Sequence, residues 1–161
     1  LLKRSAPSRI VIVASCFYQL ASLNLNNLNP VSRLPGNSYN LSKCTNVVWC
    51  LELARRLKST GVTVNCLHPG VVNTPIGRTL PPPLSWMWNI AGRVFFKTPV
   101  QGAQTSIYLA TSDEVEGVTG KYFVDSKEHA LREFVKDPVK AQKFWELSEA
   151  LVQLRETDPR I

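Results

Sequence analysis

The clearest pattern along the chain is a helical stretch between two short apolar stretches. Residues 10–13 read Ile-Val-Ile-Val, and this β-branched run is apolar on both faces, as in a strand inside a parallel sheet. From Tyr39 to about Leu57 apolar residues recur at spacings of three and four, which predicts a helix, and Gly61 suits its end. Residues 62–67 then predict a second strand. Strand, helix and strand with a short return is half of a parallel α/β repeat.

The second half of the chain predicts two more helices and a third strand. The segment of about residues 75–97 is rich in proline and then in aromatic residues. We interpret it as a hydrophobic lid over an apolar substrate, with packing in the core as the alternative. Thr98-Pro99-Val100-Gln101 has the pattern of a capping box with an early proline, which predicts a helix to about Thr111. Residues 120–124 predict a strand, and Asp137-Pro138 predicts the start of a last helix.

The charge of the chain is uneven along its length. The 161 residues carry a net charge of +7, but residues 1–80 hold nine Lys and Arg against one acid, whereas residues 81–161 hold ten against eleven acids. A basic surface of this kind can simply be solvated, or it can attract a phosphorylated cofactor or an acidic membrane surface. The basic residues are scattered and no nucleic-acid motif organises them, so we expect no nucleic-acid partner.

The cysteines and histidines argue against a metal site. The four cysteines form no C-x-x-C pair and lie among apolar neighbours, so we expect buried free thiols. Only two histidines are present, which excludes a histidine-rich metal site. The sequence therefore predicts no metal.

A tyrosine and a lysine provide the strongest candidate chemistry. Tyr39 and Lys43 are four residues apart at the start of the predicted helix, which places them on one face. A phenol is a poor base at neutral pH, but a nearby ammonium stabilises the phenolate and makes it a proton donor or acceptor. Ser15 follows the first strand and Pro69-Gly70 follows the second. Ligands of parallel α/β sheets bind beyond the carboxyl ends of the strands, so these groups should meet at one edge.

These motifs resemble the short-chain dehydrogenase/reductase family, in its retinol-dehydrogenase-like branch. The resemblance is carried by the strand that ends at Ser15, by Tyr39-Asn40-Leu41-Ser42-Lys43 and by residues 65–74, together with KTPVQGAQTSIYLATS and GKYFVD. It covers about residues 1–153 and leaves 154–161 as a tail. It implies an α/β fold, the C-terminal half of a Rossmann-like doubly wound parallel sheet. The N-terminal cofactor-binding half, with its Gly-rich phosphate turn, would precede residue 1, and the first strand would then lack a partner on one edge.

The resemblance also implies a role for each candidate residue. Tyr39 would exchange a proton with the substrate oxygen, and Ser15 would hydrogen-bond to that oxygen. Lys43 would stabilise the Tyr39 phenolate and hold the nicotinamide ribose together with it. The turn after the second strand would contact the nicotinamide end of the cofactor through Pro69, Gly70, Val71, Val72 and Thr74.

The function implied by the resemblance is that of an oxidoreductase present as a partial chain. It would transfer a hydride between a nicotinamide cofactor, NADP(H) in preference to NAD(H), and a lipophilic alcohol, aldehyde or ketone of the retinol and retinal kind. The alternative is a truncated, catalytically silent fragment that acts as a binding or dimerisation module. We expect an intracellular location, with contact to the endoplasmic reticulum or another membrane through a missing N-terminal segment. The oligomeric state stays open.

Overall fold

A computed structural model describes residues 1–28, 36–74, 82, 85–86, 92, 95–155, 157–158 and 161 of the chain. Most of the predicted lid therefore lies outside the described residues. The elements follow the order η1 (Leu2–Ser5), β1 (Ser8–Val13), η2 (Cys16–Leu20), α1 (Asn37–Arg56), β2 (Val62–His68), α3 (Pro99–Thr111), η4 (Asp113–Val115), β3 (Tyr122–Val124), β4 (Lys127–His129), η5 (Glu133–Val135) and α4 (Pro138–Leu151).

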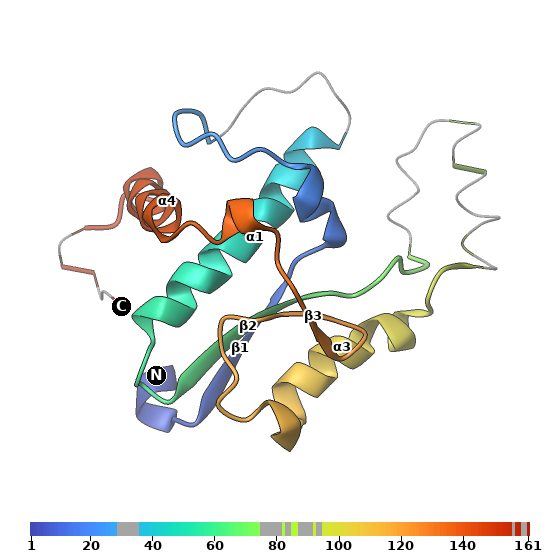
Figure 1. Ribbon diagram of the computed structural model, residues 1–161, viewed down its shortest axis with the longest axis horizontal. Coiled ribbons are helices and arrows are strands. Elements are labelled where there is room, and N and C mark those ends of the chain that lie inside the picture. Colours follow the sequence, from blue (N-terminus) through green and yellow to red (C-terminus); the bar gives the residue numbers. More distant parts are fainter. Residues whose placement is uncertain are drawn as a thin grey trace.

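The described strands form one sheet in the order β1-β2-β3-β4. The first three strands run parallel, with Ser8 opposite Val62 and Cys66 opposite Tyr122, while β4 returns antiparallel to β3. Helices α1 and α4 lie on one face of the sheet and α3 lies on the other (Figure 1). This arrangement confirms the predicted α/β class and the partial, doubly wound parallel sheet.

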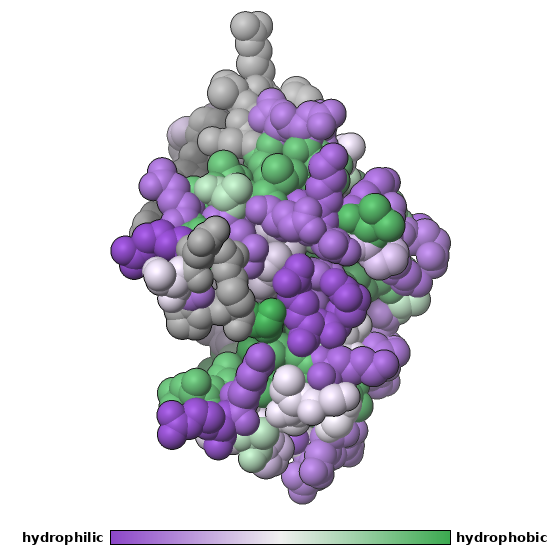
Figure 2. Space-filling view, turned by 90° about the vertical axis from the view of Figure 1, so that its left-hand side faces the viewer, coloured by the Kyte–Doolittle hydropathy of each residue, from purple (hydrophilic) through white to green (hydrophobic). Residues whose placement is uncertain are grey.

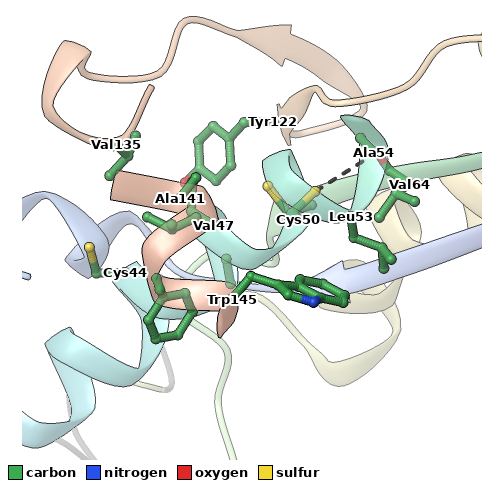
Figure 3. Packing of buried hydrophobic residues seen from close by; sticks show 14 of the residues in the cluster. Cys44, Val47, Cys50, Leu53, Ala54, Val64, Tyr122, Val135, Ala141 and Trp145 are labelled. Atoms are coloured by element: carbon green, nitrogen blue, oxygen red, sulfur yellow. Dashed lines mark hydrogen bonds between the residues drawn. The ribbon is translucent and has the colours of Figure 1, made fainter. Parts of the chain in front are cut away.

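Helix α1 buries one face between the sheet and α4. Cys44, Val47 and Cys50 point inward from this helix and are fully buried, and the Cys50 thiol lies 3.8 Å from the Val64 carbonyl oxygen of β2 (Figure 3). Trp145 of α4 packs on the opposite side of α1 from the sheet, where its ring stacks on Trp49. The four cysteines are free and three of them are buried, as the sequence predicts, whereas Cys16 is only partly covered. The burial of apolar side chains on this face is the main force that holds α1 against the sheet.

Strands β1 and β2 differ in how well they are covered. Strand β2 lies between two neighbours and most of its residues are buried. Strand β1 pairs only with β2 among the described residues, its apolar run is half-buried, and the side chain of Val13 is 46% exposed. The predicted open edge is therefore present in the structure of this chain.

The side of the molecule that carries α4 is mostly hydrophilic. Figure 2 shows this face, on which hydrophobic residues appear only as small separate groups among polar ones. Polar residues dominate the outward positions of α4, because its apolar side chains Ala141, Phe144 and Trp145 are turned toward α1 and buried. This pattern is typical of a helix that covers a sheet layer and faces solvent.

Candidate functional site

Ser15 lies just beyond the carboxyl end of β1 and caps the short helix η2. Its hydroxyl oxygen accepts a hydrogen bond from the Phe17 backbone N–H at 3.3 Å, and the residue is buried. A serine in an extended conformation before a helical turn provides this cap without strain. The cap fixes the Ser15 side chain at the carboxyl edge of the sheet, where the sequence predicts it.

Tyr39 and Lys43 lie together in the first turns of α1. The Lys43 ammonium nitrogen is 5.6 Å from the centroid of the Tyr39 ring. The Phe17 ring meets the Tyr39 ring edge to face, with 6.3 Å between the centroids. Tyr39 is 41% exposed, so a ligand can reach its ring from solvent. Because Phe17 is two residues from Ser15, the three predicted catalytic residues gather at one edge of the sheet.

A backbone carbonyl of β1 is the hydrogen-bond acceptor for Lys43. The Lys43 ammonium donates to the Val13 carbonyl oxygen at 3.1 Å, and the Asn46 side-chain amide donates to the same oxygen at 3.3 Å. Asn46 is not among the residues predicted from the sequence, although it lies three residues after Lys43 and therefore on the same face of α1. The two donors fasten the start of α1 to the end of the strand that leads to Ser15.

The turn after β2 begins with an open backbone at Gly70. Gly70 has φ of 90°, a conformation that favours glycine. Beyond it, the Asn73 N–H donates to the Lys97 carbonyl and the Lys97 N–H donates to the Val71 carbonyl, each at 2.9 Å. These bonds form a parallel bridge between Val72 and Lys97. The predicted cofactor turn is thus held by the residue that precedes α3.

The Lys97 side chain reaches the same turn from the other direction. Its ammonium donates to the Pro69 carbonyl oxygen at 3.4 Å and forms an ion pair with the Asp125 carboxylate in the β3–β4 turn. The hydrogen bond from Lys97 lowers the pKa of the Asp125 carboxyl. Sequence analysis assigned no role to either residue. Both, however, stand within the stretches KTPVQGAQTSIYLATS and GKYFVD, which carry part of the resemblance.

His68, the last residue of β2, lies beside this ion pair. Its Nδ1 atom is buried and has no hydrogen-bond partner among the described residues. Burial lowers the pKa of the imidazole, and the charge of Lys97 lowers it further, against a smaller opposing effect of Asp125. The imidazole is therefore neutral at pH 7. The structure does not link His68 to Tyr39 or Lys43.

The described residues contain neither a metal-ion site nor a membrane-spanning helix. No group of three or more His, Cys, Asp or Glu among them is placed to hold a metal ion. None of the helices described here combines the length and the apolar composition needed to cross a membrane.

Comparison with known proteins identifies relatives over nearly the whole chain. The chain is 50% identical to retinol dehydrogenase 14 of Homo sapiens over 157 residues, which is 96% of this chain and 47% of that protein. It is 36% identical to retinol dehydrogenase 11 of Mus musculus over 148 residues, which is 91% of this chain and 46% of that protein. This chain is a homologue of retinol dehydrogenases. The chain spans about half the length of these curated relatives, and the matched part is their C-terminal half.

The homology confirms the predicted resemblance to the retinol-dehydrogenase-like branch of the short-chain dehydrogenases/reductases. No family model matches the chain. A crystal structure of an uncharacterised protein from Mycobacterium paratuberculosis superposes with a TM-score of 0.64 at 24% identity, over 91% of this chain and 50% of that one. At this identity the likeness supports the fold alone. In this case too the chain corresponds to half of a longer chain.

Proposed function

We propose that this homologue of retinol dehydrogenases is the C-terminal part of an oxidoreductase. The complete enzyme transfers a hydride between NADP(H) and a lipophilic alcohol, aldehyde or ketone of the retinol and retinal kind. In this proposal residues 1–153 belong to the catalytic domain and residues 154–161 form a tail. The observation that carries the proposal is the Lys43 ammonium 5.6 Å from the Tyr39 ring centroid, at the sheet edge that also holds Ser15.

The proton chemistry of the proposed reaction belongs to Tyr39. Its exposed phenol gives a proton to a substrate carbonyl oxygen during reduction and takes one from an alcohol during oxidation. The nearby Lys43 charge stabilises the tyrosinate that forms. The Ser15 hydroxyl donates a hydrogen bond to the same substrate oxygen and orients it toward Tyr39. The hydride itself is the chemistry that the bound nicotinamide supplies.

The residues present suit the nicotinamide and ribose end of such a cofactor. An ammonium has three donors, and the Lys43 side chain uses one of them on the Val13 carbonyl, so donors remain for ribose hydroxyls. The turn of Pro69, Gly70, Val71, Val72 and Thr74 follows β2 at the same edge and offers backbone groups to the nicotinamide. The choice of NADP(H) over NAD(H) rests on the family resemblance alone.

The proposed apolar substrate fits what is described of the segment from 75 to 97. Trp86 and Phe95 belong to the few described residues of this segment, and both are largely exposed. Exposed aromatic side chains favour contact with a lipophilic ligand or with a membrane surface. We further propose an intracellular location at the endoplasmic reticulum or another membrane, reached through a segment that precedes this chain.

Removal of one hydroxyl tests the proposed role of Tyr39. In the complete enzyme, Tyr39→Phe keeps the ring and its contact with Phe17 but deletes the proton donor. Turnover of retinal with NADPH should fall about a hundredfold or more, the usual scale for loss of a general acid. The matched control is Tyr108→Phe, since the Tyr108 hydroxyl donates to the Glu114 carboxylate at 3.0 Å on the other face of the sheet. Near-normal turnover of Tyr39→Phe would show that the role assignment is wrong.

A further inference from the structure

Lys97 joins three parts of the chain that are distant in sequence. It directly precedes Thr98, the N-cap residue of α3, whose first turn is closed by the Thr98 capping box. Its ammonium contacts the Pro69 carbonyl in the turn after β2 and the Asp125 carboxylate in the turn between β3 and β4. The side chain is 30% exposed and so is largely held within this junction.

The backbone of Lys97 holds the same turn as its side chain does. Its N–H and C=O groups bond to Val71 and Asn73. The Lys97 ammonium contacts Pro69, and the Lys97 main chain bonds to residues 71 and 73. One residue therefore holds both ends of the predicted nicotinamide turn.

The surroundings of Lys97 are shaped to receive its side chain. A Cβ atom placed on Gly70 would lie 2.8 Å from the Lys97 Cδ atom, so any other residue at this position would require the lysine side chain to shift. Asp125 and Ser126 have φ of 51° and 60°, typical of a tight turn between antiparallel strands. The Ser126 N–H donates to the Thr105 hydroxyl of α3 at 3.1 Å, which anchors the turn that presents Asp125.

We propose that Lys97 is a positioning residue that sets the affinity for the nicotinamide cofactor by fixing the Pro69–Thr74 turn. The proposal rests on the proposed function, and it assigns Lys97 no part in proton transfer. The ion pair with Asp125 is partly exposed, and such pairs add little to stability. The junction is therefore better suited to fixing the position of the turn than to holding the fold together.

The test compares two lysines that both pair with acids of the β3–β4 hairpin. In the complete enzyme, Lys97→Met should raise the Kd for NADPH about tenfold, a change typical of one lost polar contact. The kcat should change less than the Kd, and Lys97→Arg should restore part of the affinity. Amide hydrogen exchange should accelerate at Asn73. The control Lys121→Met removes the pair with Glu128 on the same hairpin and should change neither readout.

Other outcomes would contradict the proposal in distinguishable ways. Unchanged exchange at Asn73 together with an unchanged Kd in Lys97→Met would overturn it. Equal losses of affinity in Lys97→Met and Lys121→Met would also overturn it, because they would indicate general damage to the hairpin. If the unmodified complete enzyme binds no nicotinamide dinucleotide while Lys97→Met still accelerates exchange at Asn73, the proposed function fails and the control of the turn by Lys97 is supported. Asp125→Asn should reproduce the effect of Lys97→Met and add little to it in the double variant.

Discussion

Lys43 is the residue on which most of the proposed chemistry converges. Its ammonium lies above the Tyr39 ring and donates to the Val13 carbonyl, so one charge serves the proposed catalytic tyrosine and a structural contact. The presence of Asn46 on the same carbonyl means that Val13 keeps a donor when Lys43 turns toward a ligand. An unsatisfied backbone carbonyl would otherwise add a cost to ligand binding.

Replacement of Lys43 by methionine isolates the role of its charge. Lys43→Met in the complete enzyme retains an apolar stem of similar length, and Asn46 still satisfies Val13. We expect NADPH affinity to fall about tenfold or more, because ribose hydroxyls lose a charged donor. The kcat for alcohol oxidation should also fall, because the positive charge beside the proposed proton acceptor is lost. Fluorescence titration and steady-state kinetics check the two effects, and an unchanged result in both would refute the assignment.

The candidate residues were predictable to different degrees. Ser15, Tyr39 and Lys43 stand in local patterns whose spacing already places them on a strand end and on one helix face. Asn46 shares that face, but its role depends on which backbone carbonyl lies opposite. Lys97 and Asp125 meet across 28 positions of sequence through a turn and a hairpin, and no local period indicates such a contact.

At the scale of elements, the helices and the central strands follow their apolar patterns closely. The capping box at Thr98 and the helix to Thr111 are confirmed. Strand β4 was missed because it is only three residues long, exposed and polar, so it has no apolar alternation to reveal it. It forms because the two-residue turn at Asp125 and Ser126 folds the chain back on β3.

Helix α1 depends on a buried acid in its last turns. Glu52 is 1% exposed and accepts hydrogen bonds from Arg55 and Arg56. Burial raises the pKa of the Glu52 carboxyl, but the hydrogen bonds and charges of the two arginines outweigh this effect and lower it overall. The guanidinium of Arg56 also stacks on Trp145, 4.5 Å from the ring centroid, which extends the network to α4.

Glu52→Gln should weaken the packing of α1 in a pH-dependent way. Because the folded pKa is lowered, the stabilisation is present above the ordinary value of 4.5 and is lost as the pH falls through the folded pKa. At pH 7 we expect the free energy of unfolding to drop by about 1–3 kcal/mol. The difference from the unsubstituted protein should shrink toward pH 3 in chemical denaturation. Glu146→Gln, on the exposed side of α4, is the control, and a pH-independent difference would contradict the role of the charge.

For the whole molecule, the open edge of β1 is the feature with the largest consequence. The strand is apolar on both faces yet only half-buried, and it has one neighbour among the described strands. An uncovered apolar edge favours association with another strand. The competing hypothesis of a silent binding or dimerisation module makes use of the same edge. The oxidoreductase hypothesis predicts that a cofactor site forms when the upstream residues are present, whereas the silent-module hypothesis predicts none.

The most direct test of this account is an NADPH fluorescence titration of two proteins. One is residues 1–161 alone, and the other is the complete protein, whose upstream residues are taken from the full-length transcript. In the proposed function, residues of this chain contact the ribose and the nicotinamide, and a Gly-rich turn upstream of them binds the phosphates. We predict saturable binding at micromolar concentrations by the complete protein. The isolated chain should show no binding and should elute from size-exclusion chromatography as an associated species. Micromolar binding by a monomeric isolated chain, or no binding by the complete protein, would contradict the account.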